Sequence, residues 1–262
     1  MDKRAVSPET LVILLAFVIG ALILIAFGSA LGSQLKEDAD IETCRLTALA
    51  QSQTRKIPVV GVSTPKTIIS LDCPRRNVKI FENKVELNGK KYGKYSFKKL
   101  SADEANRFVA EELRLCWYKM LEGKEDIFES SYIANLNKVC LICSEIEFDS
   151  GLNGKTFDGL LEYIKSKKIP RRDTTYYNYL VRQQSNKYLL NAIPWTQYTP
   201  WGYGTTQKFS DDKLSANQKY TIYFLAWKPD WLNQFIGAYT ASYYIGLGDE
   251  NKLSAECDLS VN

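Results

Sequence analysis

The absence of histidine limits the acid–base chemistry that this chain could perform. Its 262 residues contain no histidine, which excludes Ser-His-Asp and Cys-His nucleophile pairs, histidine-ligated zinc and the commonest general base. Carboxylates remain: Glu145, Glu147 and Asp149 alternate along the chain, and we expect them to share one face of a strand. Because exposed strand faces are commonly charged, we predict a solvated face there and no catalytic residue.

The cysteines are the second set of reactive side chains, and their even number suits disulfides. They are Cys44, Cys73, Cys116, Cys140, Cys143 and Cys257. A structural zinc site usually needs a second close pair beside Cys140-x-x-Cys143, and a redox pair is expected at a strand-to-helix turn. We therefore predict disulfides or buried thiols, with zinc binding and redox chemistry as alternatives. Fifteen complete pairings are open, and the sequence does not choose among them.

One loop begins like a calcium site. Asp149-Ser-Gly-Leu-Asn-Gly154 opens with the right residue, but glycine stands at the third position and Leu160 stands where a bidentate glutamate belongs. We predict a tight loop and neither a metal site nor a cofactor.

Aromatic side chains gather in the segment PWTQYTPWGYG, residues 194–204. Rings in a loop with proline and glycine can be presented to a sugar or a protein. Rings also pack under long loops in extracellular cores, which is the interpretation we favour. The candidate binding residues for a glycan or surface protein are Trp195, Tyr198, Trp201 and Tyr203.

The elements that would position these residues are mixed helices and strands, so we expect an α+β fold over residues 57–262. A capping box at Ser101 and Glu104 opens the clearest helix, which we expect to end at Gly123. Helical spacing also predicts helices after Thr156, with Phe157 facing inward, and over 175–183. Strands are predicted over 67–72, 77–81, 138–148, 220–227 and 238–247, with a turn at Asn88-Gly89 after residues 85–87.

The N-terminal part has a different character. Leu11 to Leu31 carries no charge and is long enough for one transmembrane helix. Lys3 and Arg4 precede it, which predicts a cytoplasmic N-terminus and an extracytoplasmic remainder. A removed secretory signal is the alternative. Residues 33–56 lack glycine and are rich in helix-forming residues, so we expect the helix to continue outward as a stalk.

The arrangement around this span resembles the class III signal peptide of archaeal type IV pilin-like proteins. Residues 1–4 form a short basic leader, Glu9 is the fifth residue after Arg4, and unbroken apolar sequence follows. The resemblance implies that prepilin peptidase cuts between Arg4 and Ala5, and that Glu9 pairs with the new amine of a neighbouring subunit. Arg4 stands where glycine is more usual, and Pro8 replaces the commoner apolar residue. Helix capping by Ser7, Pro8 and Glu9 is the plainer explanation.

Function follows from this setting more than from any site. The span over 5–32 meets membrane lipid and, through Gly28-x-x-x-Gly32, offers close approach to helices of other pilin-like subunits. A net charge of +4 argues against nucleic acid or an acidic partner. We predict a non-enzymatic, single-pass surface protein, pilin-like or an accessory pilus subunit, acting in assembly or adhesion. A membrane-tethered solute- or glycan-binding protein is the first alternative, and a histidine-independent extracytoplasmic enzyme the second.

Overall fold

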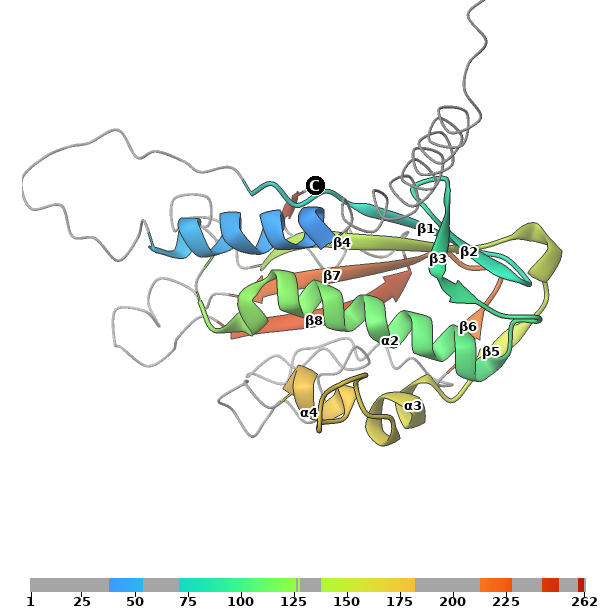
Figure 1. Cartoon of the computed structure of the whole chain (residues 1–262). Coiled ribbons are helices and arrows are strands. Elements are labelled where there is room, and N and C mark those ends of the chain that lie inside the picture. Colours follow the sequence, from blue (N-terminus) through green and yellow to red (C-terminus); the bar gives the residue numbers. More distant parts are fainter. Residues whose placement is uncertain are drawn as a thin grey trace, which may run out of the picture. The chain divides into compact units, whose positions relative to one another are not determined.

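In the part of the chain that the structure describes, seven strands form one sheet, and the helix α2, Ala102–Lys119, lies across it (Figure 1). The computed structural model describes residues 38–53, 71–125, 127, 138–181, 213–227, 242–249 and 259–261. Clustering of contacts divides the chain into Met1–Glu42 and Thr43–Asn262, and the sheet belongs to the second unit. In the ranges just given, no helix is both long and apolar enough to cross a membrane. The predicted span over 5–32 lies outside them.

The strand order across the sheet is β3-β2-β1-β4-β7-β8, with β9 as a further neighbour of β4. The strands are β1 Arg76–Ile80, β2 Lys84–Leu87, β3 Lys90–Ser96, β4 Lys138–Phe148, β7 Tyr220–Trp227, β8 Ser242–Asp249 and β9 Leu259–Val261, while β5 Thr156–Asp158 and β6 Lys213–Ser215 form a separate pair. The helices are α2 Ala102–Lys119, α3 Leu160–Ser166 and α4 Tyr176–Val181, with 3₁₀ turns η1 Leu121–Gly123 and η2 Ser150–Leu152. The mixed α+β class is confirmed.

Strand β4 is the centre of the sheet because three other strands use its two edges. β7 pairs with it antiparallel along one edge, from Lys138 to Ile146. β1 pairs with it in parallel at Ser144 to Phe148, and β9 pairs with it in parallel at Val139 to Leu141. Since β7 occupies one edge throughout, β1 and β9 must share the other edge, one at each end.

A β-bulge in β4 changes which side chains face α2. The register against β7 shifts just after Ile142, so one residue is added to β4 there. Cys143 and Ile146 therefore both reach the main core, although regular alternation would put them on opposite faces. Cys140 and Ile142 lie in a second, smaller cluster with Tyr223 on the other face.

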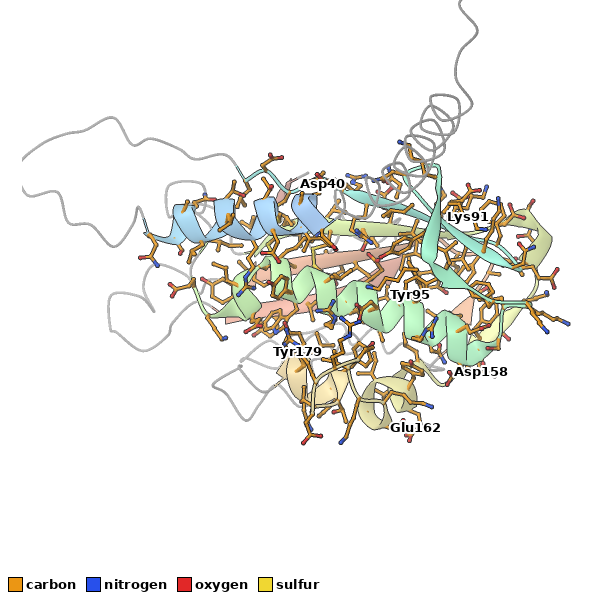
Figure 2. The ribbon with its side chains drawn as sticks, viewed as in Figure 1. Asp40, Lys91, Tyr95, Asp158, Glu162 and Tyr179 are labelled. Carbon is orange, nitrogen blue, oxygen red and sulfur yellow. A yellow bond between two sulfur atoms is a disulfide. The ribbon has the colours of Figure 1, made fainter. Side chains whose placement is uncertain are left out.

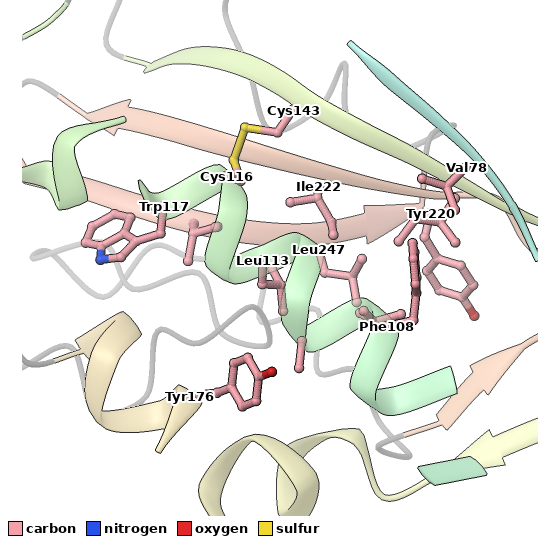
Figure 3. Packing of buried hydrophobic residues seen from close by; sticks show 14 of the residues in the cluster. Val78, Phe108, Leu113, Cys116, Trp117, Cys143, Tyr176, Tyr220, Ile222 and Leu247 are labelled. Carbon is pink, nitrogen blue, oxygen red and sulfur yellow. A yellow bond between two sulfur atoms is a disulfide. The ribbon is translucent and has the colours of Figure 1, made fainter. Parts of the chain in front are cut away.

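Helix α2 begins where the sequence predicts and supplies the core facing the sheet. The Ser101 hydroxyl accepts a hydrogen bond from the Glu104 backbone N–H at 3.3 Å, and the Glu104 carboxylate accepts one from the Ser101 N–H at 3.1 Å. Its buried side chains, among them Phe108, Leu113 and Trp117, lie over the strands (Figure 3). This packing of an apolar helix stripe on a sheet is the main source of stability in such a layer.

The helix ends earlier than predicted. Its last residue is Lys119. After Met120, three consecutive residues have positive φ angles: 54° at Leu121, 60° at Glu122 and 67° at Gly123. Such positive φ values leave the right-handed helix and turn the chain sharply. A Cβ on Gly123 would stand 2.7 Å from the Trp117 ring, so this position favours glycine on both counts.

The β2–β3 hairpin also follows local chemistry. Asn88 and Gly89 have φ angles of 51° and 76°, as the tight turn predicted there requires. The second strand, β3, was not among the predicted elements. Lys84 pairs with Ser96 whereas Glu86 pairs with Lys91, so β3 carries extra residues that bulge out of the ladder.

Three sequence predictions differ from the structure. Phe157 lies in β5 and is not part of a helix, because α3 begins only at Leu160 after a left-handed Gly159. The strand predicted over 67–72 enters the described residues only at Leu71 and Asp72, and these two are not in a strand. β8 is described from Ser242 to Asp249 and so ends two residues later than predicted, while its predicted start at 238 lies outside the described residues.

Residues 38–53 form a helix, which we call the N-terminal helix. Within the second unit, Cys44 of this helix is disulfide-bonded to Cys73, which lies just before β1. Arg45 donates a hydrogen bond to the Tyr118 carbonyl at 2.5 Å and stacks over the Tyr118 ring at 4.0 Å. The unit that contains the sheet, which we call the head, therefore begins at Thr43, inside the segment 33–56 that was expected to be a stalk.

Candidate functional site

Helix α2 carries a carboxylate into the interface with the sheet. Glu112 is 1% exposed and accepts two hydrogen bonds from Arg76 of β1, each 3.0 Å long. The two parallel bonds match the flat guanidinium to the carboxylate, which is the strongest geometry for such a pair. Arg76 also lies near the Tyr92 ring, with its central carbon 5.9 Å from the ring centroid. The pair joins α2 to the first strand.

A lysine is buried on the same helix. Lys119 is 3% exposed, seven residues beyond Glu112 and so two helical turns along the same face. Burial lowers the pKa of its amine to about 8, the attraction of Glu112 opposes that shift, and repulsion from Arg76 adds to it. Two cations therefore share one buried carboxylate, and the Lys119 charge is only partly compensated.

A second carboxylate of α2 serves a different side of the helix. Glu111 accepts two hydrogen bonds of 2.8 Å from Arg114 and one of 3.2 Å from the Tyr176 hydroxyl of α4. The Lys94 amine of β3 lies 3.5 Å away. Burial would raise the Glu111 pKa, but these partners outweigh it and lower the pKa below its ordinary value. Glu111 thus connects α2, α4 and β3.

A third buried carboxylate sits in the left-handed turn after α2. Glu122 accepts a hydrogen bond from the Tyr179 hydroxyl at 2.9 Å and another from Lys124. Burial tends to raise its pKa, and the Lys124 and Tyr179 hydrogen bonds reverse that effect, so the net shift is downward. The Tyr179 pKa is raised by burial and by Glu122. The positive φ of Glu122 is the backbone conformation that directs this side chain toward α4.

These three carboxylates make a network whose chemistry is mainly structural. Each accepts hydrogen bonds from a neighbouring element, and no group of three metal-ligating side chains occurs among the residues that the structure describes. Lys119 is the member whose pKa lies nearest neutrality, but its burial denies a substrate access to the amine. The network holds α2, α4, β1 and β3 together around the core.

The three alternating carboxylates lie where the sequence predicts, on the outer face of the sheet. Glu145 pairs with Arg75, and Glu147 has Lys79 at 3.8 Å and Lys219 at 3.6 Å. Asp149 also has the Lys79 amine, at 3.6 Å. Each carboxylate therefore faces a cation and remains partly exposed, which agrees with a solvated face.

Asp149 has a second, local role. Its side chain accepts a hydrogen bond of 3.1 Å from the Gly151 N–H and so caps the 3₁₀ turn η2. The segment 149–154 is thus a tight loop, as predicted.

The cysteines form disulfides. Cys44 bonds to Cys73, Cys116 of α2 bonds to Cys143 of β4 (Figure 3), and Cys140 is also disulfide-bonded. Cys140 and Cys143 belong to clusters on opposite faces of β4, so the two thiols of the C-x-x-C pair do not converge on a metal or on each other. The prediction of disulfides is confirmed for these five residues.

The remaining predicted site residues lie outside the described ranges. They are the processing residues Arg4 and Ala5, the assembly residues Glu9, Gly28 and Gly32, the sixth cysteine Cys257, and the four candidate binding residues Trp195, Tyr198, Trp201 and Tyr203.

Sequence reasoning missed the buried charges of α2. Charged residues of an amphipathic helix are usually exposed to solvent, yet three of them are buried in α2: Glu111, Glu112 and Lys119. The available signal was their placement: Glu112 and Lys119 fall on the same helical stripe as the apolar Cys116. Neither a family model, nor a curated protein, nor a solved structure matches this chain.

Proposed function

We propose that this chain is a single-pass membrane protein of the cell surface, a pilin-like or accessory pilus subunit acting in assembly or adhesion. The sequence supports this through a short basic leader, Glu9 at the edge of an apolar run, and a span over 5–32 followed by a head. The expected mechanism is helix bundling in the membrane or filament core, with Glu9 paired to the amine that cleavage creates on Ala5. Such a pair would offset the cost of a carboxylate near lipid.

The observation that carries the proposal is the two-sided character of the N-terminal helix. Cys44, Ala48 and Ser52 are buried and recur every four residues, so they form the face toward the head. Leu46 and Leu49 are 62% and 40% exposed, and helical spacing puts them on the opposite face. Exposed apolar side chains on a helix that the structure describes from residue 38, shortly after the predicted span, are what packing against another subunit would use.

The disulfides support an extracytoplasmic head. Two of them, Cys44–Cys73 and Cys116–Cys143, join elements far apart in the sequence. Structural disulfides persist in oxidising compartments and are rare in the cytosol. This agrees with the orientation expected from Lys3 and Arg4.

The decisive test is the N-terminus and location of the mature protein in a host that carries a prepilin peptidase. Intact mass and N-terminal sequencing should give Ala5 as the first residue, and external protease should reach the head. Met1 as the first residue would indicate a plain anchor, and a start near Ser33 would indicate a secreted protein. A head protected from external protease would overturn the proposal.

A pair of variants separates assembly from mere anchoring. Leu46→Gln with Leu49→Gln should leave insertion and cleavage unchanged but reduce crosslinking to other subunits, because the exposed apolar stripe is lost. Thr43→Ser with Gln53→Ser, at exposed positions of the same helix, is the matched control. Unchanged crosslinking together with a ligand found on a glycan array would favour the tethered binding protein instead.

A further inference from the structure

The β2–β3 hairpin carries a row of lysines that the proposed function does not use. Residues 84–99 contain six lysines and one glutamate, a net charge of +5, against +4 for the whole chain. The rest of the chain is therefore nearly neutral. The small net charge of the whole chain conceals a local concentration of positive charge. Residues 84–99 therefore do indicate an acidic partner, although the net charge of the chain does not.

The fold directs these lysines outward. The bulge in β3 turns both Tyr92 and Tyr95 into the core, and the Tyr95 ring meets Phe108 of α2 edge-on at 4.9 Å. Figure 2 shows Tyr95 beside α2 and Lys91 on the hairpin. β3 is also the last strand on its side of the sheet. Lys90 and Lys91 thus lie in the terminal strand of the described sheet, next to buried tyrosines, and Lys98 and Lys99 follow that strand in the chain.

Four of these charges are not neutralised. Lys84 pairs with Glu86 at 2.5 Å, and Lys94 lies near Glu111. Four exposed lysines make no ion pair with any residue of the described ranges: Lys90, Lys91, Lys98 and Lys99. On the neighbouring outer face of the sheet, by contrast, Arg75, Lys79 and Lys219 all face carboxylates.

Protection of the sheet edge accounts for only part of this row. Lysines on an edge strand discourage pairing with another sheet, which explains Lys90 and Lys91. Lys98 and Lys99 come after β3 has ended at Ser96, so they protect no strand edge. Four like charges that have no ion pair within the described ranges make this segment attractive to an anionic partner.

We propose that this row, Lys90, Lys91, Lys98 and Lys99, binds an acidic polysaccharide. The charges extend over up to about 30 Å of chain, so they suit a linear polymer better than a small anion. The aromatic residues of the segment are all buried, which leaves no ring on which nucleic-acid bases could stack. The segment also has no arginine to read base edges. The assignment rests on the proposed function only for meeting such a polymer outside the cell.

The test uses the full chain in non-ionic detergent with polygalacturonate as the probe. Binding at about 50 mM NaCl should weaken steeply with added salt, because ion release drives it. Replacing Lys90, Lys91, Lys98 and Lys99 by glutamine should weaken binding about tenfold or more and flatten the salt dependence. Since all four side chains are exposed, thermal unfolding should be unchanged.

The matched control removes the same charge elsewhere. It replaces four other exposed lysines by glutamine: Lys165, Lys167, Lys168 and Lys213. This control should bind polygalacturonate like the wild type. Equal weakening in both variants, no binding by the wild type, or tighter binding to duplex DNA than to polygalacturonate would each overturn the assignment. Because the readout is binding in vitro, it is independent of the cleavage and location that test the proposed function.

Discussion

Replacing Lys119 by methionine should stabilise the protein. Methionine keeps the unbranched side chain and its packing but removes a buried charge. The Lys119 pKa falls from 10.5 to about 8 on folding. Because each pKa unit corresponds to about 1.4 kcal/mol, the charged Lys119 amine destabilises the folded state by about 3 kcal/mol. Glu112 keeps its two hydrogen bonds to Arg76 in the variant, so no new unpaired charge arises. The expected gain at pH 7 is about 2 to 3 kcal/mol.

The pH dependence gives the sharper signature. Because the pKa is lowered on folding, the unfolded chain holds the proton more tightly above pH 8, and stability contributed by this group rises with pH. Between pH 7 and about 9.5 the wild type should gain about 2 kcal/mol relative to Lys119→Met, so the two proteins converge. The range stops there because burial raises the pKa of several tyrosines, Tyr163 to about 12, and their titration enters at higher pH.

Denaturant unfolding with the disulfides intact, followed by tryptophan fluorescence, measures both effects. Lys165→Met is the control, since Lys165 is exposed on α3 and its replacement should not change the slope of stability with pH. A Lys119→Met protein that is less stable than the wild type at pH 7, or a difference that does not shrink as pH rises, would refute the reasoning. Either result would mean that Lys119 is a net stabilising member of the cluster.

Three further predictions concern single features. Glu112→Gln should destabilise the protein by about 3 to 5 kcal/mol, because two buried cations lose their shared carboxylate; denaturant unfolding measures this. Gly246→Ala should destabilise it by about 1 to 3 kcal/mol, since a Cβ there would stand 2.3 Å from the Tyr223 ring; the thermal midpoint checks it. Peptide mapping without reduction should recover Cys140 joined to Cys257, the cysteine left over by the two other bonds.

The two stability predictions each have a control variant within the chain. Glu145→Gln removes an ion-paired carboxylate that is partly exposed, and should cost about 1 kcal/mol or less. Gly93→Ala has open space for a Cβ and should be close to neutral. Equal losses at the paired positions would show that burial is not the cause. A free thiol at Cys140 in the native protein would contradict the mapping prediction.

Local signals in the sequence predict the elements with the strongest patterns. The capping box at Ser101 located the start of α2, and the apolar run at 138–148 located β4 with its bounds. Asn88-Gly89 located the hairpin turn. These signals act within a few residues, so they survive whatever the rest of the chain does.

Features that depend on distant partners could not be predicted in this way. The end of α2 depends on Trp117 closing over Gly123. The Cys116–Cys143 pairing depends on the sheet and α2 meeting across 27 residues of sequence. The return of Ile146 to the core face depends on the bulge, which is a property of two strands in register. The helical stripe of Glu112 indicates that it can be buried, but its partner Arg76, in a strand 36 residues earlier, is evident only from the structure.

The lysine row illustrates the opposite case, in which the signal was present but a whole-chain average concealed it. A net charge divided over 262 residues says little, whereas six lysines in residues 84–99 are visible in the sequence alone. The structure adds that Lys90, Lys91 and Lys94 lie in β3, the terminal strand of the described sheet, and that four of the six lysines make no ion pair within the described ranges.

The shared edge of β4 bears on when the sheet can be completed. β1 precedes β4 in the chain, whereas β9, Leu259–Val261, comes after β7 and β8. During synthesis β1 can pair with β4 as soon as β4 has been made, but the part of the β4 edge that β9 covers stays open until residues 259–261 follow. A chain without residues 259–261 would keep that part of the β4 edge unpaired, and an unpaired edge is prone to association with strands of other molecules.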